Sequence, residues 1–205
     1  MQLLASNATL EGNLVKTHLI VKTMDGRSYS CPKEIMKGSL LIREVLEDED
    51  DAVSAPPGGA SSVSGEAVVA PVEIPLPAID SKAFAAVFEY LEHHSGDTAG
   101  GRVKEIERPL RSDLSALIEP WDWKFVLDTL LLGVGEKGIH NLFSVLNASN
   151  YLNVLPLRDL CGAAIANLVR NKSEEDILHL FGITEPFTKE QEDELVKEFP
   201  WLKDQ

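Results

Sequence analysis

Basic side chains are scarce in this chain. Its 205 residues include 19 lysines and arginines against 33 aspartates and glutamates, which gives a formal net charge of −14 at pH 7. Nucleic acids and anionic membranes both attract positively charged protein surfaces. The charge balance therefore argues against a nucleic-acid or membrane partner, and it fits a protein that meets basic patches on other proteins. The sequence also lacks an apolar run of about 18 residues, so it predicts no membrane-spanning helix.

Cysteine is rare as well. The two cysteines, Cys31 and Cys161, are far apart and lie in apolar sequence contexts. We expect both to be reduced and structural, as in proteins of the cytosol and nucleus. The N-terminus, MQLLASNATLEGNLVK, lacks the basic start and apolar core of a secretory signal. Together these features predict a cytoplasmic and nuclear protein.

Sequence signatures of catalysis are missing too. The chain has no G-x-S-x-G elbow, no phosphate-binding glycine loop and no H-E-x-x-H. His93 and His94 are adjacent, so on a helix their side chains diverge by about 100°, and without a third ligand they are poor metal ligands. We expect no active site, no metal and no cofactor. A small hydrolase that uses Cys161 or His94 is the competing hypothesis, and a thiol-reactive probe at neutral pH would test it.

The remaining pattern is a mixture of short strands and helices. Residues 18–23 and 27–31 form two strand-like runs joined by Asp25-Gly26. That dipeptide is typical of two-residue hairpins in which both turn residues have positive φ. Residues 72–76 form a third strand-like run, and Ser39 and Asp80 are expected to cap helices with apolar faces. The sequence predicts an α+β domain in which helices cluster on one side of a small three-stranded sheet.

Three segments lack the pattern of a packed core. We expect residues 1–16 to form a loose extension and residues from about 95 to 117 to form a loose loop. From about 49 to 71 the composition is acidic, rich in Ser, Gly and Pro and free of aromatics, which predicts a disordered insertion. The apolar segment 127–138 is instead expected to lengthen a helix or cover a core edge.

The C-terminal third predicts a series of short helices. Ser173 and Thr188 each begin a capping-box pattern, and Pro156 suits a first helical turn. This region carries more large apolar side chains than so small a unit can bury alone, and burying one of them is worth roughly 1.5–3 kcal/mol. An exposed set would form a docking surface. The alternative is that these residues pack back on the rest of the domain, as most apolar helix faces do.

Six segments, in the same order along the chain, resemble the S-phase-kinase-associated (Skp) adaptor family. They are DGRSYSCPKEIMKGSLLIREVLED, IPLPAIDSKAFAAVFEYLEHH, IEPWDWKFV, LFSVLNASNYLNV, ANLVRNKSEEDILHLFGI and FTKEQEDELVKEFPWL. The resemblance implies a BTB/POZ fold over residues 17–155, extended over residues 156–205 by the Skp dimerisation helices that bind an F-box. The extension at 1–16 and the insertion at 49–71 depart from the compact core of that family.

The helix at 142–154 is the first binding surface that the resemblance implies. Its apolar residues cover more than one stripe, so one face can pack inward while another faces outward. By resemblance, the outward face meets the N-terminal helices of a cullin through Val145, Ala148, Asn150, Tyr151 and Val154. The competing expectation is plain core packing, above all for Val145.

The C-terminal helices are the second implied surface. By resemblance, the small helical bundle of an F-box interleaves with Leu160, Ile177, Phe181, Ile183, Phe187, Val196, Phe199 and Trp201. We expect the Trp and Phe side chains to be energetic anchors, because buried aromatic residues commonly dominate interface energetics.

The resemblance implies a non-enzymatic adaptor that bridges a cullin scaffold to F-box substrate receptors in an SCF-type E3 ubiquitin ligase, for ubiquitin-dependent protein degradation. An alternative keeps the F-box proteins but drops the cullin, which gives a structural subunit of a complex such as a kinetochore or vacuolar-ATPase regulator. Chains free of F-box protein are further expected to form a weak homodimer through the unoccupied F-box surface.

Overall fold

The computed structural model describes residues 1–4, 14–54, 71–95, 105–132, 136–183, 185 and 187–204. The chain divides into two compact units, Met1–Leu168 and Val169–Gln205. The expected disorder of residues 55–70 lies outside the described residues, as does the part of the expected loose loop from 96 to 104.

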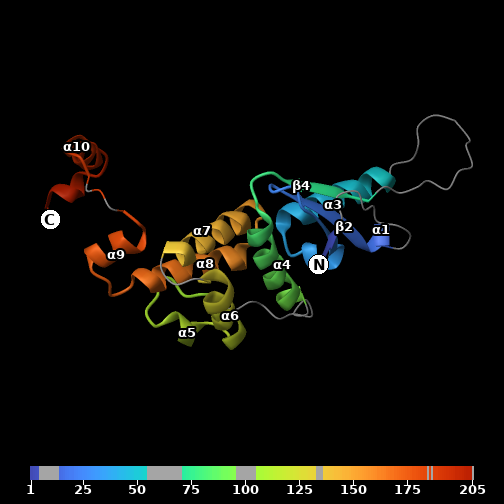
Figure 1. The fold of residues 1–205 in the computed structure, drawn as a ribbon, viewed down its shortest axis with the longest axis horizontal. Helices are drawn as coiled ribbons and strands as arrows, with labels where there is room; N and C mark the ends of the chain where they lie inside the picture. The colour runs from blue at the N-terminus through green and yellow to red at the C-terminus, as the bar shows by residue number, and fades with distance from the viewer. Residues whose placement is uncertain are drawn as a thin grey trace, which may run out of the picture. The chain divides into compact units, whose positions relative to one another are not determined.

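The first unit contains a small sheet of four strands (Figure 1). They are β1 (Gln2–Leu4), β2 (His18–Thr23), β3 (Ser28–Pro32) and β4 (Glu73–Leu76), in the spatial order β1-β3-β2-β4. β3 pairs antiparallel with both β1 and β2, and β4 pairs parallel with β2. The expectation of three strands is therefore wrong. The extra strand comes from the segment expected to be a loose extension, because residues 2–4 pair with the otherwise open edge of β3.

The hairpin between β2 and β3 is longer than the two-residue turn that Asp25-Gly26 predicts. Only Gly26 has positive φ, at 77°. Its amide donates to the Thr23 carbonyl at 2.9 Å, and the Thr23 amide donates to the Arg27 carbonyl at 2.9 Å. This is the three-residue loop in which a turn is followed by a residue in the left-handed region. Asp25 therefore keeps negative φ, and its side chain forms hydrogen bonds outside the turn.

The Asp25 carboxylate joins the hairpin to the start of helix α4 (Ser81–Ser95). It accepts hydrogen bonds from the Thr23 hydroxyl at 2.6 Å and from the Ser81 hydroxyl and amide at 2.6 and 3.2 Å. The Ser81 hydroxyl first, and then the Thr23 hydroxyl, lower the pKa of Asp25 below its ordinary value. Asp80 caps the same helix, as predicted, by accepting from the Ala83 amide at 2.7 Å.

The helices of the first unit are mostly short. They are α1 (Leu14–Thr17), α2 (Lys33–Met36), α3 (Leu40–Ser54), α4, α5 (Leu114–Leu117), α6 (Pro120–Phe125), the π-helix η2 (Val126–Leu130), α7 (Glu136–Tyr151) and α8 (Leu155–Val169). α3 continues to Ser54, into the expected insertion. α5 lies within the segment expected to be a loose loop. It packs against the rest of the first unit because Leu114 is fully buried and its amide donates to the Asn167 side chain at 3.1 Å.

One apolar core joins the sheet to α4, α7 and α8. α4 packs against α7, and Figure 1 shows both next to α8. Leu130 of η2 is fully buried and Leu131 packs against the core. The expectation that the 127–138 segment covers a core edge is confirmed for these two residues but not for Leu132, which is exposed. The architecture is mixed α+β, as the sequence predicts.

The regular elements of the second unit are all helices over its described residues. It contains α9 (Glu174–Leu180), α10 (Lys189–Glu198) and the 3₁₀-helix η3 (Pro200–Asp204). Both predicted caps are present: the Ser173 hydroxyl accepts from the Asp176 amide at 3.2 Å, and Thr188 forms a complete capping box with Gln191. None of the described helices in either unit combines the length and the apolar character that a bilayer crossing requires.

Candidate partner-binding surfaces

The C-terminal end of α7 is fixed by its own backbone and by α3. Asn153 has φ of 54°. Its amide donates to the Asn150 carbonyl at 3.1 Å, and the Val154 amide donates to the Ser149 carbonyl at 2.8 Å. These two bonds form a Schellman motif, in which a left-handed residue ends the helix. The Ser39 hydroxyl donates to the Leu152 carbonyl at 2.5 Å and accepts from the Ile42 amide at 3.2 Å, so the predicted cap of α3 also holds this end of α7.

The α7 residues expected to meet a cullin are divided between the core and the surface. Val145 is 0% exposed, and Ala148 and Val154 are also buried in the core cluster. The expectation that these three face outward is wrong. α7 turns Val145 and Ala148 toward the rest of the core, and Val154, just past the end of α7, is buried there too. Asn150 and Tyr151 are exposed, with 43% of the Tyr151 surface accessible. Only these two members of the set can contact another protein directly in this conformation.

The residues expected to meet an F-box lie, with one exception, in the second unit. We call these seven residues the tail surface: Ile177, Phe181, Ile183, Phe187, Val196, Phe199 and Trp201. Ile183, Phe187, Phe199 and Trp201 are exposed, with 63% of the Trp201 surface accessible, and the other three are half-buried. The exception is Leu160, which is buried in the core of the first unit. Its expected direct contact with an F-box is therefore wrong for this conformation.

Local structure presents several of the tail side chains to solvent. α9 ends on a second Schellman motif: Gly182 has φ of 68°, its amide donates to the His179 carbonyl, and the Ile183 amide donates to the Leu178 carbonyl. Glycine occupies this position without strain. The reversal carries Ile183 away from the helix axis. Farther along, the rings of Phe199 and Trp201 lie 6.5 Å apart at 64° and form an edge-to-face pair.

Neither cysteine has the surroundings of a nucleophile. Cys31 and Cys161 are both fully buried and unpaired as a disulfide. Burial raises the pKa of each thiol to about 12. A thiolate is the reactive form of cysteine, so both side chains are inert thiols near neutral pH. This is the opposite of what a hydrolase that uses Cys161 would need.

His93 and His94 belong to an aromatic cluster at the end of α4. The His93 ring stacks on Trp121 at 3.7 Å and 4°. The His94 Nε2 atom lies 3.0 Å from Asp122 Oδ1, and both side chains are almost completely buried. Nothing in the sequence around His93 and His94 predicts this packing, because Trp121 and Asp122 follow 28 residues later. Among the described residues, no group of His, Cys, Asp or Glu side chains is arranged to hold a metal ion.

A core domain with inert thiols, together with exposed aromatic side chains on a short helical tail, is typical of a protein-interaction subunit. Comparison with known proteins identifies which one. A family model described as the Skp1 family dimerisation domain matches residues 156–202. The suppressor of kinetochore protein 1 of Schizosaccharomyces pombe is 33% identical over 180 residues, which cover 88% of this chain and 94% of the relative. The chain belongs to the Skp1 family.

Two further relatives are similar over most of their length. The SCF subunit sconC of an E3 ubiquitin ligase complex in Emericella nidulans is 29% identical over 186 residues, or 91% of this chain and 96% of the relative. The S-phase kinase-associated protein 1 homologue of Tetrahymena thermophila is 29% identical over 192 residues, or 92% and 95% of the two chains. The resemblance drawn from the sequence is therefore confirmed.

Proposed function

We propose that this chain is an adaptor that links a cullin scaffold to F-box substrate receptors in an SCF-type E3 ubiquitin ligase. It contributes geometry, and other subunits carry out ubiquitin transfer in ubiquitin-dependent protein degradation. The observation that carries this proposal is the tail surface, which lies within the matched Skp1 dimerisation domain and holds exposed Phe187, Phe199 and Trp201. The name of the Emericella nidulans relative, an SCF subunit, supports the same assignment.

The proposed contacts follow from exposure. An F-box packs on the tail surface, where Trp201 and Phe187 are the anchors because they offer the most accessible aromatic area. A cullin contacts Asn150 and Tyr151. Val145, Ala148 and Val154 act from inside the core by holding the end of α7 that carries Asn150 and Tyr151, and Leu160 stabilises the core of the first unit. The mixed α+β arrangement of the first unit supports a BTB/POZ fold. We further propose that the adaptor acts in the cytoplasm and nucleus.

A two-partner binding experiment tests the proposal. The full chain would be titrated with an F-box domain and, separately, with an N-terminal cullin fragment from the same organism. Trp201→Ala should weaken F-box binding alone, and Tyr151→Ala should weaken cullin binding alone. Binding of the F-box without any cullin affinity would favour a structural subunit of an F-box complex instead. Failure to bind either partner would overturn both assignments. Sedimentation of the free chain at increasing concentration would test the weak homodimer.

A further inference from the structure

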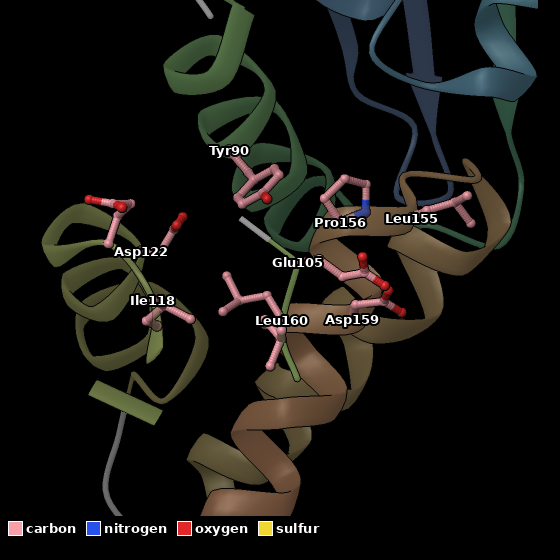
Figure 2. A pocket seen from close by; sticks show the side chains of 10 residues that line it. Tyr90, Glu105, Ile118, Asp122, Leu155, Pro156, Asp159 and Leu160 are labelled. Carbon is pink, nitrogen blue, oxygen red and sulfur yellow. The ribbon is translucent and has the colours of Figure 1, made fainter. Parts of the chain in front are cut away.

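A pocket of about 200 Å³ lies in the first unit between the end of α4, the start of α6 and the start of α8. Its walls include the apolar side chains of Ile118 and Leu160, and four carboxylates surround it (Figure 2). These are Glu105, Glu119, Asp122 and Asp159. Neither surface proposed above uses this pocket, although Leu160 contributes to its wall.

The negative charge of the pocket is only partly compensated. Asp122 Oδ1 lies 3.0 Å from His94 Nε2, and the Asp159 carboxylate lies 2.6 Å from the Arg108 guanidinium and 3.4 Å from the Arg158 guanidinium. Glu105 and Glu119 form no ion pair with any residue that the structure describes, and no described lining residue is basic. The pocket therefore has a surplus of carboxylate oxygens that can accept hydrogen bonds.

The hydroxyl of a buried tyrosine points into this acidic space. Tyr90 is only 2% exposed, and Figure 2 shows its hydroxyl directed toward the interior of the pocket. The hydroxyl hydrogen-bonds to none of the residues in the described part of the chain. The hydroxyl is therefore available to hydrogen-bond to a group that enters the pocket.

The electrostatics around Tyr90 indicate the charge of that partner. Burial raises the pKa of Tyr90 above its ordinary value, and the negative charges of Asp122 and Asp159 raise it further. The phenol is neutral and keeps its proton. A negative field that opposes ionisation of the phenol also attracts a cation to the same space.

A metal ion does not suit the site, because the described carboxylates do not converge at coordinating distance. An organic cation with several N–H donors can reach carboxylates that are farther apart, and its alkyl stem can lie along Ile118 and Leu160. We propose that this pocket binds a guanidinium or primary ammonium group, which donates to Glu105, Glu119 or Asp159 and hydrogen-bonds to the Tyr90 hydroxyl. The cation belongs either to an arginine or lysine side chain of a partner protein or to a free aliphatic amine.

Small probes can separate these two sources. The full chain, labelled with ¹⁵N, would be titrated with N-acetyl-arginine methylamide, with its neutral citrulline analogue and with free putrescine. We expect saturable shifts at Tyr90 and the lining residues with at least one cation, and a Kd at least tenfold higher for the citrulline analogue. Tighter binding of the arginine compound points to a protein side chain, and tighter binding of putrescine points to a free amine.

Variants of the pocket decide whether the cation binds where proposed. Glu105→Gln combined with Glu119→Gln should raise the Kd at least tenfold. The matched control, Glu44→Gln with Asp128→Asn, removes the same charge from two exposed positions outside the pocket and should leave the Kd within about twofold.

Tyr90→Phe removes the hydroxyl without breaking a hydrogen bond of the described chain. We expect this variant to unfold at the same urea concentration as the wild type, while its Kd for the cation rises at least threefold. Equal binding of the citrulline analogue, unchanged binding in the double variant or in Tyr90→Phe, or the absence of saturable shifts with both cations would each overturn the proposal. Binding of F-box and cullin should be unaffected by Tyr90→Phe, so this test is independent of the proposed function.

Discussion

Truncating Val145 should weaken the fold, whereas truncating Tyr151 should weaken only cullin binding. Val145 is 0% exposed, so Val145→Ala removes buried hydrocarbon equivalent to two methylene groups, each worth about 0.8 kcal/mol, and leaves a small cavity. We expect the free energy of unfolding to fall by about 2 kcal/mol. At roughly 2–4 °C per kcal/mol for a domain of this size, the Tm would fall by about 4–8 °C. Tyr151 is 43% exposed, so Tyr151→Ala should change the free energy of unfolding by less than about 0.5 kcal/mol.

Urea unfolding and cullin titration, carried out on the same preparations, separate the two effects. Under conditions where every variant is folded, Tyr151→Ala should raise the Kd for a cullin fragment about 30-fold, equivalent to about 2 kcal/mol. Val145→Ala should leave that Kd within about threefold. Met24→Ala serves as the control, because Met24 is 61% exposed and lies on neither proposed surface. A wild-type urea midpoint for Val145→Ala, together with a large rise in Kd, would refute the assignment of Val145 to the core.

Three further predictions concern the tail, the thiols and acid stability. Trp201→Ala should raise the Kd for an F-box domain by about 30-fold or more with an unchanged urea midpoint, and wild-type affinity would remove Trp201 from the interface. Because the pKa values of Cys31 and Cys161 are raised to about 12, a thiol-reactive probe at pH 7.5 should label neither in the native protein and both in urea; rapid native labelling would contradict their burial. The pKa of Asp25 is lowered by its hydrogen bonds from Ser81 and Thr23, so its contribution to stability is complete above the unfolded value of about 3.9. That contribution is lost as pH falls through the lower folded value. The free energy of unfolding of Asp25→Asn should therefore fall less than that of the wild type between pH 5 and pH 3. Equal losses would show that Asp25 does not contribute.

Local signals in the sequence were sufficient to predict the helix caps and the strands β2, β3 and β4. Ser39, Asp80, Ser173 and Thr188 all accept the backbone hydrogen bonds expected of capping residues. These bonds join residues three positions apart, so neighbouring residues determine them. β4 was also predicted, because its apolar residues are bounded by an insertion of very different composition.

Features that depend on distant residues were not predicted. β1 has three residues and no alternation to identify it, and it exists because the edge of β3 offers backbone partners. Helical spacing groups Val145 with other apolar residues of α7, but it cannot tell which face turns inward. The pocket brings Tyr90 near Asp159. The sequence around each of these residues does not predict that they lie close together. In each case the missing information is a tertiary contact.

Burial gives the two proposed interfaces unequal support. The apolar residues of α7 are explained by the core they fill, so their presence requires no partner, and the cullin assignment depends on exposed Asn150 and Tyr151 alone. The tail surface is different. Phe187, Phe199 and Trp201 leave much of their aromatic area in solvent, where it contributes little to folding and favours association. The helix caps and the Schellman motif define the helices of the second unit by local hydrogen bonds, and these bonds do not require the aromatic side chains to be buried. The tail surface is therefore the stronger argument that this chain acts by binding another protein.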